Sequence, residues 1–469
     1  MRIAEIQALL ADPNTRRIHC IGLGGVGVGG IAEWLNQQGF DVSGSDLSDG
    51  PRLQYYREQG ITVLIGHDSS YVDGVDLIVH TSAAGSDHPE RIAALKAGIP
   101  LCSRGEALAA LANKHTSIAV SGTHGKTTTT SLLTHALKQA SLPVSYYVGG
   151  TIGDSPSTIG VEPDGICVME SDESDASFLH LTPTCVVVTN IDTDHLSTYE
   201  GSVERLRECF CRFVNSIPDH GLAILCVDDP GVQAMLPDVS VNYCTYGFSE
   251  EADYRVLAIR QEGLMAHVTW QTPDGNPHNF ELPMPGSHNA LNALSACIAQ
   301  RWASGSESVK SVTFSAFPGV ARRFTVHGEY AVADGSAIIV EDYGHHPTEM
   351  TATVQGVRIA WPDRRLVMVF QPHRYTRTAA LMDDFVASLA LSDYVFLLPV
   401  YAASEDPIPG ADSASMAKAV SALSGDEPTC VRDQAQLFEV LRETLQPNDV
   451  VVFQGAGDVG AMAKALLMS

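Results

Sequence analysis

The chain has 469 residues, 45% of them hydrophobic, which is enough to build several buried cores. Its formal net charge of −26 excludes a general nucleic-acid-binding or anionic-membrane surface, because both need a basic patch. The ten cysteines form no Cys-x-x-Cys pair and no run of about 18 apolar residues occurs, so we predict a cytoplasmic protein without a zinc framework or a membrane-spanning helix.

The first strand-like run leads into a glycine cluster, IHCIGLGGVGVGG (residues 18–30). Within it Gly22, Gly24 and Gly27 fit the pattern G-x-G-x-x-G, and Asp46 follows the next strand-like run. Glycines let the backbone approach a diphosphate at a helix N-terminus, and an acidic residue at this spacing can bind a ribose hydroxyl. The pattern therefore indicates a diphosphate ligand, which NAD and a UDP-sugar share.

A second series of alternating strands and helices begins at SIAVSGTHGKTTTT (residues 117–130). It has the strand, glycine turn, lysine, hydroxyl residue and helix of a phosphate-binding loop, although Val120 stands where the strict pattern has its first glycine. Lys126 supplies a positive charge for phosphates, and the Thr127 hydroxyl can bind Mg²⁺. The alternative is an ordinary capped helix with an exposed lysine. That alternative would not explain why all five features occur together in the right order.

Acidic side chains follow the next two strand-like runs, in ESDESDASF (residues 170–178) and TNIDTDHL (residues 189–196). The carboxyl ends of parallel strands form the ligand-binding edge of an α/β sheet. We therefore expect at least one of Glu170, Asp172, Glu173 and Asp175 to hold Mg²⁺, and His195 to contact metal or substrate. A solvated acidic loop is the alternative for any single residue.

The remaining chain indicates two further parts. Residues 240–283 predict a β-rich stretch, and FPGVARRF (residues 317–324) predicts a linker, after which strands and helices alternate again. We therefore predict an α/β protein of three domains, spanning residues 1–108, 109–320 and 321–469. The last domain contains a second G-x-G-x-x-G pattern, at residues 455–460.

Four motifs, SGTHGKTTTT, ESDESDASF, TNIDTDHL and GSHNALNALSA, together resemble the Mur ligases, ATP-dependent enzymes that assemble the peptide of peptidoglycan precursors. GVARRF, EDYGHHPTE and FQPHRYTR are similar to the branch that joins L-alanine to UDP-N-acetylmuramate. The resemblance implies a Rossmann-like N-terminal UDP-sugar domain, a central P-loop ATPase domain and a C-terminal Rossmann-like amino-acid domain. It also implies that ATP phosphorylates the lactyl carboxylate and that the amine of L-alanine displaces the phosphate.

The resemblance further implies a role for individual positions. The catalytic residues would be Lys126, Glu173 and His195, with two Mg²⁺ ions held by Thr127, Glu173 and His195. ATP would be bound by Gly122, Thr123, His124, Gly125, Lys126, Thr127, Thr128, His288, Asn289, Asn292, Arg322, Arg323 and Asp342. The UDP-sugar would be bound by Gly22, Gly24, Gly25, Gly27, Asp46, Leu47, His67 and Ser82. The amino acid would be bound by Tyr343, His345, His373, Arg374 and Arg377.

One departure and three alternatives accompany this interpretation. Several family members carry a carbamylated lysine after the histidine of TNIDTDHL, but residues 196–214 contain no lysine and offer Glu200, Glu204 and Glu208 instead. The alternatives are a sister ligase that adds a recycled peptide to the same UDP-sugar, a nicotinamide-dependent dehydrogenase and a non-catalytic nucleotide sensor. The third-domain motifs favour a free amino acid, and we expect a monomer or weak homo-oligomer with no nucleic-acid or membrane partner.

Overall fold

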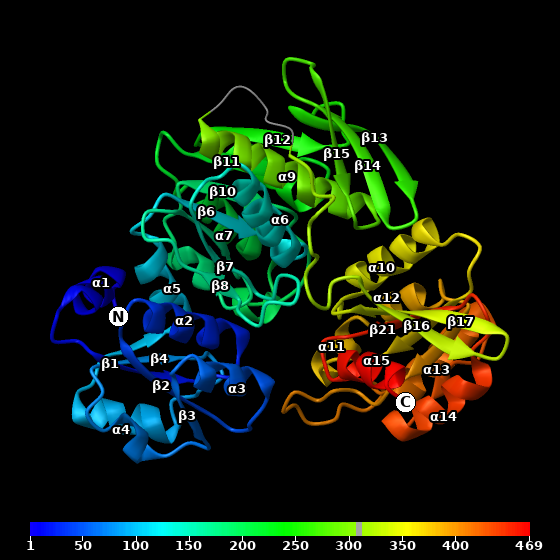
Figure 1. Ribbon diagram of the computed structural model, residues 1–469, viewed down its shortest axis with the longest axis horizontal. Helices are drawn as coiled ribbons and strands as arrows, with labels where there is room; N and C mark the ends of the chain where they lie inside the picture. The colour runs from blue at the N-terminus through cyan, green and yellow to red at the C-terminus, as the bar shows by residue number, and fades with distance from the viewer. Residues whose placement is uncertain (306–311) are drawn as a thin grey trace. The chain divides into compact units, whose positions relative to one another are not determined.

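The computed structural model describes residues 1–305 and 312–469, which form three sheets flanked by helices (Figure 1). This arrangement confirms the predicted α/β class. The described residues divide into two compact units. The first contains Met1–Ala258, Val268–Phe280 and Leu291–Pro318, and the second contains Ile259–His267, Glu281–Ala290 and Gly319–Ser469.

The first sheet has five parallel strands in the order β3-β2-β1-β4-β5. Its strands are β1 (Arg17–Ile21), β2 (Asp41–Asp46), β3 (Thr62–Ile65), β4 (Leu77–His80) and β5 (Leu101–Ser103). Its helices are α1 (Ile3–Ala11), α2 (Val26–Gln37), α3 (Pro51–Glu58), α4 (Pro89–Ala97) and α5 (Arg104–Ala112), with the short 3₁₀ helix η1 (Ser69–Val72). Because the strand order reverses at β1, the glycine cluster that follows β1 lies where α/β sheets bind ligands.

The second sheet has ten strands in the order β15-β14-β13-β12-β11-β10-β6-β9-β7-β8. Its strands are β6 (Ser117–Ser121), β7 (Val144–Tyr147), β8 (Ile159–Gly160), β9 (Ile166–Glu170), β10 (Cys185–Val188), β11 (Leu222–Cys226), β12 (Tyr243–Gly247), β13 (Tyr254–Glu262), β14 (Met265–Gln271) and β15 (Pro277–Leu282). The helical elements are α6 (Lys126–Gln139), η2 (Ser177–His180), η3 (Leu196–Tyr199), α7 (Val203–Val214), α8 (Pro230–Met235), η4 (Leu236–Asp238) and α9 (Ser287–Ser304). Strands β9 and β10 flank β6 in parallel, so the loops after all three emerge at one edge.

The third sheet has six strands in the order β16-β17-β21-β18-β19-β20, with only β16 antiparallel to its neighbour. Its strands are β16 (Thr325–Val332), β17 (Gly335–Asp342), β18 (Leu366–Phe370), β19 (Tyr394–Leu397), β20 (Thr429–Cys430) and β21 (Val450–Gln454). Its helices are α10 (Pro347–Ala360), α11 (Tyr375–Ala380), α12 (Met382–Leu389), α13 (Ser413–Ser424), α14 (Gln434–Thr444) and α15 (Val459–Leu467). Met368 and Val369 pack in different hydrophobic cores, so both sheet faces are covered and the strand is continuously apolar.

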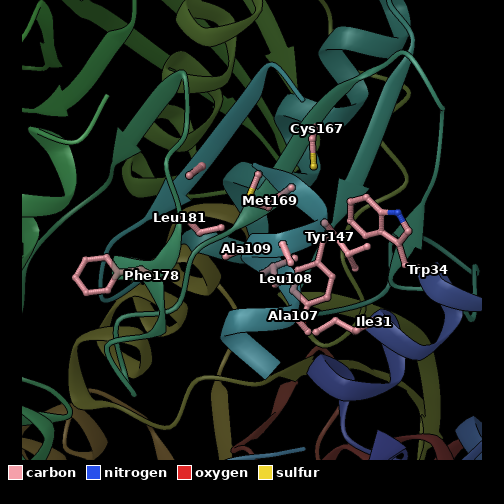
Figure 2. Packing of buried hydrophobic residues seen from close by; sticks show 14 of the residues in the cluster. Ile31, Trp34, Ala107, Leu108, Ala109, Tyr147, Cys167, Met169, Phe178 and Leu181 are labelled. Carbon is pink, nitrogen blue, oxygen red and sulfur yellow. The ribbon is translucent and has the colours of Figure 1, made fainter. Parts of the chain in front are cut away.

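A hydrophobic core within the first unit joins elements of its two sheets (Figure 2). Trp34 on α2 and Ala109 on α5 are fully buried in it, together with Met169 on β9 and Phe178 on η2. Close packing of this kind leaves little freedom to the loops at the ends of these elements. The core therefore holds α2 and α5 of the first sheet together with β9 and η2.

The helices of residues 1–305 and 312–469 include none with both the length and the apolar character that crossing a bilayer requires.

Candidate active site

The predicted phosphate-binding loop connects β6 to α6. Gly122 and Gly125 have φ angles of +135° and +82°, a region that side chains rarely adopt, so the loop requires glycine at both positions. The N–H of His124 donates to Asn190 Oδ1 (2.8 Å), which ties the loop to the segment after β10. Because α6 begins at Lys126, the N–H groups of its first turn have no acceptor within the helix. This geometry suits a phosphate group.

Lys126 and Glu173 form a buried ion pair inside this loop. Lys126 Nζ lies 2.8 Å from Glu173 Oε2, and it also donates to the carbonyls of Gly122 (2.6 Å) and Thr123 (3.0 Å). The Glu173 side chain is 1% exposed, and burial raises its pKa to about 7 despite the nearby lysine. Burial lowers the pKa of Lys126, but Glu173 and other carboxylates outweigh it and hold that pKa above its usual value. Lys126 thus stays protonated at the phosphate loop.

His195 follows β10 and starts η3. Its φ angle is +55°, and its Nε2 lies 3.3 Å from Asp194 Oδ2. The next residues bind the loop of Glu173: Thr198 Oγ1 donates to the Ser174 carbonyl (2.6 Å), and Tyr199 Oη donates to the Glu173 carbonyl. The segment that carries His195 is therefore tied to the segment that carries Glu173.

The side chains here fit a magnesium ion by their chemistry. Glu173 offers two carboxylate oxygens, and Thr127, 5% exposed at the start of α6, offers a hydroxyl. Hard oxygen donors of this type are the ligands that Mg²⁺ prefers. A cation would also compensate the Glu173 charge if Lys126 turned toward a phosphate. Glu173 and Thr127 therefore fit the predicted metal site, whereas His195 offers a ring nitrogen and its role as a ligand stays a prediction.

The predicted adenine-side residues lie on α9. Asn292 is 7% exposed, and a Cβ added to Gly125 would lie 2.8 Å from its Oδ1, so this amide reaches the phosphate loop. Asn289 is buried and donates from Nδ2 to the Pro285 carbonyl (2.8 Å). His288 is exposed, and its ring lies against Gly286. Asn292 is thus the member of this motif that contacts the loop within the first unit.

The predicted UDP-sugar residues surround the glycine cluster after β1. The Gly24 N–H donates to Asp46 Oδ2 (2.8 Å), so Asp46 braces the glycine turn with one carboxylate oxygen. Gly22 has a φ angle of +86°, while Gly25 and Gly27 bound the start of α2.

The three residues assigned to the uracil side differ in their surroundings. His67 Nδ1 lies 2.8 Å from the buried carboxylate of Glu90, so one ring nitrogen already has a partner. Leu47 is 75% exposed and Ser82 is also exposed, so both are accessible to a ligand.

Arg322 is firmly held in the second unit. Its Nε donates to Glu341 Oε1 (2.8 Å), and its Nη2 donates to the carbonyls of Gly455 (2.9 Å) and Gly457 (3.0 Å). A Cβ added to Gly460 would lie 1.9 Å from Glu341 Oε1. The second G-x-G-x-x-G pattern therefore makes room for this arginine and its carboxylate.

Two other residues assigned to ATP lie nearby. Asp342 is 8% exposed and accepts N–H donations from Phe324 (2.9 Å) and Gly344 (2.8 Å), which shapes the turn after β17. The guanidiniums of Arg322 and Arg323 lie over the Tyr343 ring, 4.7 and 5.2 Å from its centroid. This stacking connects the proposed nucleotide-binding arginines with a residue assigned to the amino acid.

The residues assigned to the amino acid form a chain of rings beyond β17 and β18. Tyr343, His345 and His373 follow one another with centroid separations of 5.3 and 5.9 Å. Burial lowers the pKa of both histidines to about 4, so both rings are neutral at neutral pH. Arg374 is exposed and Arg377 half-buried at the start of α11. A neutral histidine ring can accept a hydrogen bond from the amine of an amino acid, and a nearby guanidinium can bind its carboxylate.

Comparison with known proteins identifies the fold family. A model of the Mur ligase family catalytic domain matches residues 17–116, one of the Mur ligase middle domain matches residues 120–300, and one of the Mur ligase glutamate ligase domain matches residues 322–457. This chain belongs to the Mur ligase family. The three-domain α/β fold predicted from the sequence is therefore confirmed, and the Mur ligase family uses ATP.

Individual relatives of this Mur ligase cover nearly its whole length. The UDP-N-acetylmuramate–L-alanine ligase of Coxiella burnetii is 43% identical over 453 residues, which is 96% of this chain and 97% of the relative. The solved UDP-N-acetylmuramate-alanine ligase MurC of Thermotoga maritima superposes with a TM-score of 0.80 at 26% identity, covering 96% and 98% of the two chains. A murein peptide ligase from Psychrobacter arcticus shares the fold, with a TM-score of 0.70 at 23% identity and 97% and 98% coverage.

Two residues that contact predicted site residues of this Mur ligase were not predicted from its sequence. Tyr401 stacks on His373 at 5.5 Å with an interplanar angle of 9°, and Glu341 holds Arg322. Tyr401 comes shortly after β19, the neighbour of β18, so the rule that ligands gather beyond strand ends could have found it. Glu341 is the first residue of the motif EDYGHHPTE, but nothing in that motif indicated its ion pair with Arg322, which lies 19 positions away.

Proposed function

We propose that this Mur ligase joins L-alanine to the lactyl carboxylate of UDP-N-acetylmuramate, with ATP converted to ADP and phosphate. The observation that carries the proposal is the 43% identity to the Coxiella burnetii ligase over 96% of the chain. The buried Lys126–Glu173 pair at a phosphate loop is the feature expected for the ATP half of this reaction.

A carboxylate is a poor acylating group because oxide would have to leave. Transfer of the γ-phosphoryl group to the lactyl carboxylate gives an acyl phosphate, from which phosphate can leave. In this proposal the first turn of α6 binds the phosphates, and Lys126 moves its ammonium from Glu173 to the phosphate oxygens. Mg²⁺ would draw the two anions together and neutralise charge that develops between them. The chain contributes mainly by positioning and by charge.

The amine of L-alanine then attacks the acyl carbon, the tetrahedral intermediate collapses, and phosphate leaves as the amide forms. Arg374 and Arg377 would bind the alanine carboxylate through a guanidinium fork. The neutral rings of His345 and His373 can accept a hydrogen bond from the amine without repelling it. Alanine differs from glycine or serine by about one small group. A pocket distinguishes such ligands by a free-energy difference of only about 1–3 kcal/mol.

The sister activity, addition of an intact peptide to the same UDP-sugar, is the second candidate. Its support is the fold shared with the murein peptide ligase from Psychrobacter arcticus, at 23% identity. The higher identity to the L-alanine ligase favours the free amino acid. Because either reaction consumes ATP, we expect it to occur in the cytoplasm.

The deciding experiment measures phosphate release by the purified chain with ATP, Mg²⁺ and UDP-N-acetylmuramate. One reaction contains L-alanine, a second contains the tripeptide L-Ala-γ-D-Glu-meso-diaminopimelate, and a third contains neither. We expect release that depends on L-alanine and a product heavier than the UDP-sugar by one alanyl residue. Release with the tripeptide alone would select the sister activity, and release in none would reject both.

A further inference from the structure

Arg104 connects the two substrate loops of the first unit. It is the first residue of α5, and its side chain is 17% exposed. One terminal nitrogen, Nη2, lies 3.1 Å from Asp172 Oδ2, 3.0 Å from Asp175 Oδ2 and 3.2 Å from Ser177 Oγ. Asp172 and Asp175 belong to the loop after β9 that also carries Glu173, and Ser177 starts η2 at the end of that loop. Arg104 therefore holds the acidic loop from the side of the first sheet.

The stem of the same side chain lies against the glycine cluster. A Cβ added to Gly27 would lie 2.5 Å from Arg104 Cδ and 3.4 Å from its Nε. Tyr147 Oη donates to the Gly27 carbonyl (2.9 Å), so β7 supports the same residue from another direction. Because Gly27 has no side chain, Arg104 can pack against the first turn of α2, beside the proposed diphosphate site. Glycine is therefore needed at this position independently of any ligand.

We propose that Arg104 is a positioning residue that fixes the UDP-sugar loop and the Glu173 loop relative to each other for phosphoryl transfer. This inference rests on the proposed function, because the relative position of the loops matters only if a UDP-sugar carboxylate meets ATP there. Reacting atoms must be aligned closely, and misplacement by about 1 Å can cost on the order of 100-fold in rate. Arg104 itself contacts neither of the reacting groups in this proposal.

The test compares Arg104→Ala and Arg104→Lys with the wild type in three measurements. We expect Arg104→Ala to lower kcat by about 10- to 100-fold. Its dissociation constant for UDP-N-acetylmuramate, measured by calorimetry without ATP, should change by less than about threefold, because the glycine loop keeps its own contacts. Its thermal unfolding midpoint, the third measurement, should lie well above the assay temperature, so that the loss of kcat does not reflect unfolding. Arg104→Lys should recover kcat only in part, because an ammonium cannot reproduce the guanidinium fork.

Arg358→Ala is the matched control, since Arg358 forms an ion pair with Asp393 (2.8 Å) within the second unit. It should leave kcat and affinity unchanged. A kcat of Arg104→Ala within twofold of wild type, or parallel losses of affinity and thermal stability, would each overturn the inference. A wild type that is inactive with L-alanine would instead reject the proposed function, so the two failures are distinguishable.

Discussion

Lys126 Nζ lies 2.8 Å from Glu173 Oε2 in a nearly buried ion pair, at the loop where a nucleotide phosphate is expected. Two charges buried together stabilise each other, whereas either one alone would be costly. For the proposed reaction the lysine must turn to phosphate and the glutamate to a cation, so both charges remain compensated throughout. In this proposal the ion pair belongs to the substrate-free enzyme. When substrates bind, phosphate replaces Glu173 as the partner of Lys126, and a cation replaces Lys126 as the partner of Glu173.

Replacement of Lys126 tests this directly. We expect Lys126→Ala to lower the rate of phosphate release at least about 100-fold, because the phosphates lose a fixed positive charge. Lys138→Ala is the matched control, since Lys138 lies near the end of the same helix and its ammonium lies over the Tyr146 ring. A rate for Lys126→Ala near that of Lys138→Ala would contradict the assignment.

The pKa of Glu173, raised to about 7 by burial, predicts a dependence of activity on pH and Mg²⁺. The ionised carboxylate is the form that binds a cation, so activity should fall as pH falls through this value. Because the metal competes with the proton, saturating Mg²⁺ should move the acid limb to lower pH. The measurement is a set of pH–rate profiles at low and high Mg²⁺. An acid limb at the same pH in both would argue against Glu173 as a ligand.

Gly24 and Gly50 provide a matched pair for the UDP-sugar loop. A Cβ on Gly24 would lie 2.9 Å from Asp46 Oδ2, whereas a Cβ on Gly50 would meet nothing within 4 Å. Gly24→Ala would disturb the bond from its N–H to Asp46, and we expect the KM for UDP-N-acetylmuramate to rise about tenfold. Gly50→Ala should leave this KM unchanged. Equal KM values for the two variants would show that the loop does not bind the sugar nucleotide.

Arg322 and Arg323 should differ although they are neighbours. Arg322→Ala would leave Glu341, which is 2% exposed, without its guanidinium, and we expect the free energy of unfolding to fall by about 1–3 kcal/mol. Arg323→Ala should change it by less than about 0.5 kcal/mol but should lower kcat and alter ADP release. Denaturant unfolding and ADP-release kinetics of both variants are the measurements. Equal stability losses, or unchanged ADP release in both, would contradict this division.

The alternation of strands and helices along the chain and the position of motifs after strands could be predicted from the sequence, because apolar runs and glycine turns are local signals. The proximity of Lys126 to Glu173 follows from β6 and β9 being neighbours, but their ion pair does not, since it depends on side-chain burial. The contact of Arg322 with Gly455 spans 133 positions and needs the pairing of β17 with β21. Such contacts between distant segments leave no local pattern.

Oxygen transfer from substrate to phosphate is the most direct test of the acyl-phosphate route. UDP-N-acetylmuramate labelled with ¹⁸O in its lactyl carboxylate is incubated with ATP, Mg²⁺, L-alanine and the purified chain. The phosphate and the UDP-linked product are then analysed by mass spectrometry. The account predicts one ¹⁸O in the released phosphate and one in the new amide carbonyl. Alanine-dependent product formation with unlabelled phosphate would contradict it.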